Sequence, residues 1–160
     1  MKTGFLSLIL HAHLPYVRHP EHESFFEENW LFEAITECYI PLIGVLDRLQ
    51  QDQIQYRLTL SLSPPLLCML RDELLQQRYH KYLKSRIDLS KKEVIRTQNL
   101  AEFKPLAEYY LKFYQNTLAV YQRKLAKVLK HLEKNKNKKD YPCVRAIPRF
   151  KANLFRLNNA

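Results

Sequence analysis

Only two segments of this chain carry the pattern of a β-strand, and a long helical segment lies between them. Residues 4–10 form a nearly continuous apolar run, which is typical of a parallel strand buried on both faces. Residues 54–62 alternate apolar and polar side chains, which predicts a second strand. Two paired strands leave open sheet edges, which proteins normally avoid. The pattern therefore predicts an α/β fold whose sheet is incomplete within these residues.

Helical periodicity fills most of the remaining sequence. Residues 25–51 place apolar side chains at three- and four-residue steps, and Pro41 is expected to break this run and to begin a second helix. Residues 64–82 predict the next helix, with Ser63 as its N-cap. A more polar helical stretch follows over residues 86–98.

The longest periodic segment spans residues 103–134. Its predicted apolar face consists of Leu106, Tyr110, Phe113, Leu118, Tyr121, Leu125, Val128 and Leu132. Helices of this length, combined with strands that alternate with helices, favour the α/β class.

Length and composition limit the class of protein. With 160 residues, 46% of them hydrophobic, the chain is expected to form one domain with its own core. No apolar run approaches the ~20 residues that span a membrane, and the run near the start lacks a signal-peptide cleavage site. The three widely spaced cysteines, Cys38, Cys68 and Cys143, are expected to be reduced thiols, which favours a cytoplasmic location.

The net charge of +10 comes from the end of the chain. Residues 1–110 hold thirteen Lys and Arg against fourteen Asp and Glu, whereas residues 111–160 hold thirteen against two. Residues 135–160 combine a Lys/Asn run, two Pro and no apolar period, which predicts a basic, disordered tail after a body of residues 1–134. A Lys-rich helix face is more often solvated than bound to nucleic acid, so a nucleic-acid partner is not favoured.

Histidine is concentrated directly after the first predicted strand. His11 and His13 are two residues apart and would lie on the same side of an extended backbone. Loops at the carboxyl ends of parallel strands form the ligand crevice of α/β folds. Three interpretations of the pair remain open: a metal site, which lacks a nearby Asp, a structural role through hydrogen bonds to backbone carbonyls, and hydrogen bonding to a substrate.

Four segments together resemble a known enzyme family. They are LILHAHLPYVRHPE at residues 8–21, EENWLFEAITECYIPL at residues 27–42, LTLSLSPPL at residues 58–66 and FYQNTL at residues 113–118. In the first of them an apolar strand runs into the pattern His-x-His-x-Pro-Tyr-Val-Arg. Over about residues 4–130 the chain resembles glycoside hydrolase family 57, and in particular its 1,4-α-glucan branching enzymes.

The resemblance implies a fold and a set of binding residues. The implied fold is a seven-stranded (β/α) barrel followed by helical domains, of which this chain holds the first β/α units with long helices. The implied activity is retaining chemistry on α-glucans without a metal or other cofactor. By resemblance, His11 and His13 belong to the substrate-binding floor. Trp30 is a sugar-stacking aromatic or a buried anchor, and Tyr16 and Arg18 contact substrate or order the loop.

The resemblance ends after the long helix. The family pattern continues into a third strand and a His-Gly-containing motif, whereas this chain continues with a Lys/Asn-rich run and has no Gly after position 44. A retaining glycosidase needs two carboxyl groups about 5–5.5 Å apart, and the family supplies them from later strands. Glu27, Glu28 and Glu33 fit charges at a helix start and on its exposed turns, so no catalytic residue is assigned.

These observations predict the N-terminal portion of a family 57 enzyme, which contributes substrate binding but not the catalytic pair. The expected partner is an α-1,4-glucan such as glycogen or amylose. Alone, the chain is expected to be inactive and to associate with itself through uncovered apolar surface. The alternative is a small non-catalytic protein that binds glucan or nucleic acid.

Overall fold

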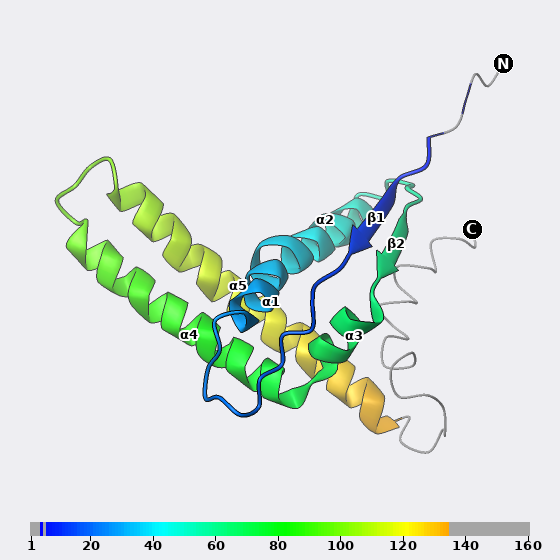
Figure 1. The fold of residues 1–160 in the computed structure, drawn as a ribbon. Helices are drawn as coiled ribbons and strands as arrows, with labels where there is room; N and C mark the ends of the chain where they lie inside the picture. The colour runs from blue at the N-terminus through cyan, green and yellow to red at the C-terminus, as the bar shows by residue number, and fades with distance from the viewer. Residues whose placement is uncertain (1–3, 5, 135–160) are drawn as a thin grey trace.

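The computed structural model describes residue 4 and residues 6–134, and it describes side chains up to residue 123. In chain order the elements are β1 (Ile9–Ala12), α1 (Glu28–Glu33), the π-helical segment η1 (Ala34–Tyr39), α2 (Ile40–Gln51), β2 (Thr59–Leu62), α3 (Pro64–Arg71), α4 (Glu73–Arg96) and α5 (Lys104–Lys134). The helices α4 and α5 form a long hairpin, and the small sheet lies beside α2 and α3 (Figure 1). The expected tail, residues 135–160, lies outside the described residues.

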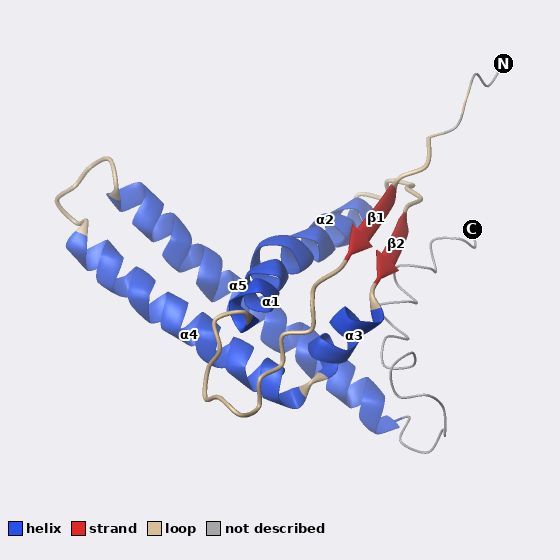
Figure 2. Cartoon of the chain, in the orientation of Figure 1, coloured by secondary structure: helices blue, strands red, loops and turns tan. Residues whose placement is uncertain are grey.

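The two strands pair in parallel, as an α/β fold requires. Ile9 lies opposite Thr59, and His11 lies opposite Ser61. Both strands are shorter than the sequence predicts, and β1 begins five residues later than expected because its hydrogen bonds extend only as far as β2 does. Over the described residues the chain is mostly helical, with one small parallel sheet (Figure 2).

The expectation that the first strand is buried on both faces is wrong for the described residues. Leu6 is 98% exposed, Leu8 54% and Ile9 64%. The apolar run therefore has no packing partner on one face, since β1 is paired on one side only and no described helix covers its outer side chains. Exposed apolar surface of this kind favours association.

Pro41 lies in the first turn of α2, as predicted, but it does not break the helical run, contrary to the sequence prediction. The segments α1, η1 and α2 follow one another without an interruption. The Ile40 amide donates to the carbonyl of Ile35, an i→i−5 bond that widens the turn directly before Pro41. A π-turn of this kind accommodates a residue that has no N–H to donate and whose ring crowds the preceding turn.

The helix expected over residues 64–82 is divided at Asp72. This residue has an extended backbone (φ −69°, ψ 121°), and its carboxylate Oδ1 accepts a hydrogen bond of 3.0 Å from the Leu75 amide. Asp72 therefore ends α3 and caps α4 at its N-terminus. Ser63 occupies the predicted N-cap of α3, with Pro64 and Pro65 in the first turn, but its side chain makes no capping bond.

The core forms where α4 meets α1, α3 and η1. Its buried side chains are Val17, Leu31, Phe32, Ile35, Leu66, Met69, Leu75, Tyr79 and Leu83. From α5, the side chains of Tyr114, Leu118 and Tyr121 pack against this cluster. Burial of these apolar surfaces is the main favourable contribution to the free energy of folding.

The helix α5 begins within one residue of its predicted start, but its apolar face is covered only in part. Leu118 and Tyr121 pack against the core, whereas Leu106 is 53% and Tyr110 45% exposed. The exposed part lies on the N-terminal half of α5, where the hairpin projects away from the sheet (Figure 1).

We expect the chain to lose stability in alkali, because the buried Tyr79 and the half-buried Tyr121 resist ionisation in the folded state. Burial raises the pKa of Tyr121 to about 12, and burial also raises the pKa of Tyr79 well above its usual range. The folded state therefore holds these protons more tightly than the unfolded state, where the tyrosine pKa is about 10. Their contribution is complete below about pH 10 and is lost as the pH rises towards 12 and beyond.

Urea unfolding at a series of alkaline pH values measures this effect. In Tyr121→Phe, the loss of unfolding free energy per pH unit should be smaller than in the unaltered chain, by up to about 1.4 kcal/mol for the one proton removed. Tyr109→Phe, at a side chain that is 60% exposed, is the matched control and should leave the slope unchanged. Identical slopes for all three proteins would contradict the prediction.

Candidate functional site

The two histidines of the first motif lie together at the carboxyl end of β1. His11 is in the strand, and His13 follows directly after its last residue. Their rings are nearly parallel, at an interplanar angle of 11° and with centroids 6.1 Å apart. This is the arrangement expected for residues i and i+2 on one side of an extended backbone. Both side chains are exposed, so their ring nitrogens are accessible to a ligand.

The neighbouring strand provides a polar partner for this pair. Ser61 of β2 lies opposite His11, and its Oγ is 3.1 Å from His11 Nδ1. A hydrogen bond at Nδ1 restricts the ring and leaves Nε2 for another partner. Ser61 was not among the residues predicted from the sequence, although its place near the end of the second predicted strand, in the segment of residues 58–66, is a signal that could have identified it.

In the loop after His13, an exposed aromatic residue is followed directly by a buried one. Tyr16 is 59% exposed, whereas Val17 is only 3% exposed. The Val17 amide donates to Sδ of Met69 on α3 at 3.2 Å. Because residue 17 is held against α3, the adjacent Tyr16 side chain is directed to solvent on the opposite side of the backbone.

Arg18 forms an ion pair with the residue that separates α3 from α4. Its Nε lies 2.6 Å from Oδ2 of Asp72. The side chains are 31% and 22% exposed, so the pair is partly screened by water. Asp72 thus uses one carboxylate oxygen to cap α4 and the other to hold the loop.

Glu28 and Arg78 form a buried ion pair that the sequence analysis missed. The prediction that Glu28 is an exposed helix-start charge is wrong: the residue is 1% exposed, although it does begin α1. Its Oε1 accepts a hydrogen bond from Nη1 of Arg78, whose side chain is 13% exposed. Nothing in the spacing of the two residues indicates that they meet, since fifty residues separate them.

A second cluster of side chains lies at the far end of the same loop. The His19 ring packs against Phe25 with centroids 3.8 Å apart, and its Nδ1 is 3.1 Å from Oε1 of Glu21. A backbone hydrogen bond, followed in importance by the hydrogen bond with His19, lowers the pKa of Glu21. His19 Nε2 also lies 3.6 Å from Oε2 of Glu27. His19 thus lies between two acidic side chains, Glu21 and Glu27.

Trp30 lies on a different element from the other predicted site residues. It is on α1 and is 45% exposed, so it is not a fully buried anchor. Among the described residues it shares no hydrogen bond or ring contact with His11, His13, Tyr16 or Arg18. The structure thus brings together the histidine pair, and it places Arg18 in an ion pair and Tyr16 at the surface.

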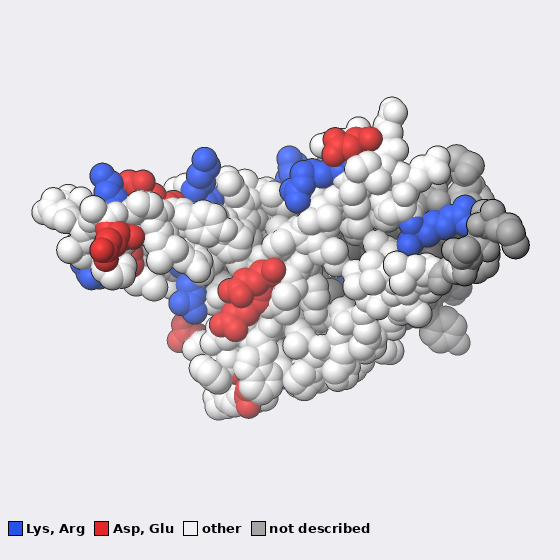
Figure 3. Space-filling model, turned by 90° about the horizontal axis from the view of Figure 1, so that it is seen from above, with Lys and Arg blue, Asp and Glu red and all other residues white. Residues whose placement is uncertain are grey.

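Neither a metal-binding cluster nor a membrane-spanning helix occurs among the described residues. No group of three or more His, Cys, Asp or Glu among these residues is arranged to hold a metal ion. Within the same residues no helix is long and apolar enough to cross a membrane. Acidic and basic side chains are interspersed on the face that Figure 3 shows.

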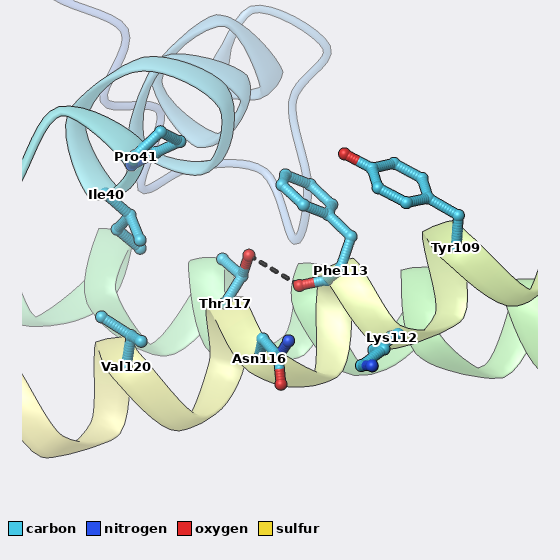
Figure 4. Close-up of a pocket in the computed structure, with 8 residues that line it drawn as sticks. All are labelled: Ile40, Pro41, Tyr109, Lys112, Phe113, Asn116, Thr117 and Val120. Carbon is cyan, nitrogen blue, oxygen red and sulfur yellow. Dashed lines mark hydrogen bonds between the residues drawn. The ribbon is translucent and has the colours of Figure 1, made fainter. Parts of the chain in front are cut away.

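A pocket of about 470 Å³ lies between α5 and the start of α2. It is lined by Ile40, Pro41, Tyr109, Lys112, Phe113, Asn116, Thr117 and Val120, and the Thr117 hydroxyl donates to the Phe113 carbonyl at 2.9 Å (Figure 4). None of the candidate site residues lines this pocket, so it does not extend the histidine site.

Comparison with known proteins assigns the chain to a family. Residues 7–141 match the model described as Glycosyl hydrolase family 57, so the chain belongs to this family. A 1,4-alpha-glucan branching enzyme of Thermococcus kodakarensis is 35% identical over 85 residues, which cover 52% of this chain and 12% of that protein. A probable 1,4-alpha-glucan branching enzyme of Mycobacterium tuberculosis is 31% identical over 80 residues, covering 50% of this chain and 15% of that protein. The resemblance found in the sequence is confirmed.

Two solved structures share the fold of this region. The alpha-amylase AmyC from Thermotoga maritima is 40% identical, with a TM-score of 0.70, over 81% of this chain and 24% of that chain. A GH57-type branching enzyme from Pyrococcus horikoshii is 26% identical, with a TM-score of 0.70, over 82% of this chain and 25% of that chain. This chain therefore spans about a quarter of each solved structure, and the complete seven-stranded barrel stays a prediction, as does the domain boundary at residue 134.

Asp72→Ala should lower the free energy of unfolding by about 1–3 kcal/mol, because it removes both the cap of α4 and the pair with Arg18. Asp72→Asn keeps a capping oxygen and removes only the charge, so its loss should be about 1 kcal/mol or less. Arg18→Gln removes the ion pair and leaves the cap of α4 in place, so its loss in the free energy of unfolding should be similar to that of Asp72→Asn. Denaturant unfolding measures all three, and equal losses for the Ala and Asn variants would show that the cap contributes nothing.

Proposed function

We propose that this chain supplies the first two strands and part of the glucan-binding floor of a family 57 enzyme that acts on α-1,4-glucans. The proposal rests on family membership, which is shown, and on the histidine pair at the carboxyl ends of the two parallel strands. In parallel α/β folds, this end of the sheet is the usual place for ligands.

The single observation that carries the proposal is the contact between His11 and Ser61. It joins the two strands at the site, at a distance of 3.1 Å, and it orients an exposed ring. Sugar hydroxyls both donate and accept hydrogen bonds, and an imidazole offers one donor and one acceptor nitrogen when neutral. His11 with its neighbour His13 thus presents a row of groups suited to hydroxyls.

The exposed aromatics complete the proposed binding surface. Tyr16 is 59% and Trp30 45% exposed, so the apolar face of a sugar could stack on either ring, and each ring carries a polar atom. Arg18 is proposed to order the loop through Asp72 rather than to bind sugar directly, because its guanidinium is already engaged.

For the reaction of a complete enzyme, we propose glucan branching by a retaining mechanism, in line with the curated relatives. Such a mechanism cleaves an α-1,4 bond, forms a covalent glycosyl-enzyme through one carboxylate and transfers the sugar to another hydroxyl with the help of a second carboxyl group. Hydrolysis is the second candidate, and the 40% identity to an alpha-amylase supports it. The two reactions share the α-1,4-glucan and differ in the acceptor.

The catalytic pair is proposed to come from residues other than those of this chain. Two carboxylates that hold the site loop to other elements are engaged in ion pairs, Glu28 with Arg78 and Asp72 with Arg18. Each of these carboxylates has a structural partner within the fold, so we assign neither of them to catalysis.

The first expected outcome concerns sugar binding. Maltoheptaose should quench or shift the fluorescence of Trp30, the single tryptophan of the chain, if the sugar stacks on its ring. His11→Ala and His13→Ala should each weaken the affinity by about three- to tenfold, which corresponds to one net hydrogen bond. Isothermal titration calorimetry gives the affinities.

The matched control is His80→Ala. This histidine lies on α4 and contacts Gln122 at 3.1 Å, and it takes no part in the proposed surface. Its substitution should leave the affinity unchanged. An equal effect of His80→Ala and His11→Ala, or no binding of maltoheptaose by the unaltered chain, would count against the proposed binding surface.

The second expected outcome concerns catalysis. The purified 160-residue chain should not change the iodine-staining spectrum of amylose, because the mechanism needs two carboxyl groups about 5–5.5 Å apart and we propose that this pair lies outside the chain. A complete family 57 branching enzyme is the positive control. Reproducible turnover that exceeds a His11→Ala control would show that this chain carries its own catalytic pair and would overturn this part of the proposal.

A further inference from the structure

The loop between β1 and α1 carries the proposed sugar-binding residues but has little regular structure of its own. Between residue 13 and the start of α1 it contains no helix or strand. Its internal backbone bonds include the one from the His22 amide to the His19 carbonyl, at 3.3 Å. The conformation of such a loop must therefore come from contacts with the elements around it.

Arg78 makes the largest set of these contacts. From α4, its guanidinium donates to the carboxylate of Glu28, to the His19 carbonyl at 3.1 Å and to the His22 carbonyl. The Glu28 carboxylate in turn accepts from the His19 amide at 3.4 Å. One side chain thus binds the first residue of α1 and two carbonyls of the loop.

Burial makes this arrangement sensitive to the loss of either partner. The side chains of Arg78 and Glu28 are 13% and 2% exposed. Removal of one charge would leave the other buried and unpaired, which is far costlier than the loss of a surface pair. The planar guanidinium reaches several acceptors at once, whereas a lysine ammonium is a point charge on a flexible stem.

We infer that Arg78 is a positioning residue, which fixes the loop of Tyr16 to His22 for sugar binding without contacting the sugar. This inference rests on the proposed function in naming glucan as the ligand. The anchors at Val17 and Arg18 adjoin the segment that Arg78 holds, so the loop is fixed at three successive residues from Val17 to His19. Tyr16, immediately before them, takes its direction from this segment.

The experiment compares Arg78→Lys and Arg78→Ala in the full chain by hydrogen–deuterium exchange and by maltoheptaose titration. Arg78→Lys keeps a charge for Glu28 but cannot span the carbonyls, so the amides of residues 16–19 and 21–23 should exchange about tenfold faster or more. Exchange in α4 and α5 should stay as in the unaltered chain. The affinity for maltoheptaose should fall by about tenfold in parallel.

Chemical rescue separates positioning from general stability. Millimolar guanidinium should fill the space left in Arg78→Ala, restore slow exchange in residues 16–19 and 21–23 and recover the affinity. Arg86→Lys is the matched control: this arginine is on the same helix, stacks on Tyr82 at 4.8 Å and does not touch the loop. It should change neither loop exchange nor affinity.

Three results would overturn the inference. They are unchanged loop exchange in Arg78→Lys, acceleration that is equal in the loop and in α4–α5, and faster loop exchange with unaltered sugar affinity. Absence of maltoheptaose binding by the unaltered chain would instead contradict the proposed function. In that case the inference fails as a statement about glucan, and loop exchange alone decides whether Arg78 holds the loop.

Discussion

The structure depends on the packing of one tyrosine on α4. Tyr79 is 1% exposed, and its hydroxyl is 2.9 Å from Oγ1 of Thr36 in η1. Its ring lies 5.7 Å from Phe32 of α1 and makes an edge contact with Tyr121 of α5 at 4.7 Å. Because the ring is apolar and its one polar atom is satisfied, three helical segments converge on this residue without an unpaired buried group.

The position of Tyr79 also decides where the adjacent Arg78 points. A residue one position earlier on a helix is turned by about 100°, so a buried Tyr79 directs its neighbour towards a different face. On that face lie Glu28 and the loop after β1. The packing of Tyr79 in the core thus places the Arg78 guanidinium at the site loop. One orientation of α4 accounts for both the core packing of Tyr79 and the loop contacts of Arg78. A change in the core is therefore expected to reach the loop through α4.

Local sequence patterns predicted which helices and strands form, but they predicted the boundaries of these elements less well. The helix α5 and the parallel pair of strands were predicted from the pattern of apolar side chains, although part of each predicted apolar face is exposed in the structure. Pro41 was misjudged because a π-turn, which depends on the packing of the whole helix, replaced the expected break. Asp72 was missed as a boundary because apolar spacing continues across it, and only its carboxylate at the cap ends the helix.

In the candidate site too, local sequence predicts some features but not those that depend on how the helices pack. The histidine pair is recognisable from a local motif, and its geometry follows from the alternation of an extended strand. Glu28 and Arg78 meet across fifty residues, and no local pattern records a pairing that the packing of α1 on α4 creates. The candidate residues His11 and His13 belong to a short motif and can be recognised from the sequence. The Glu28–Arg78 ion pair depends on how the helices pack, so a search by motif alone finds the candidate residues but not the ion pair that holds their loop.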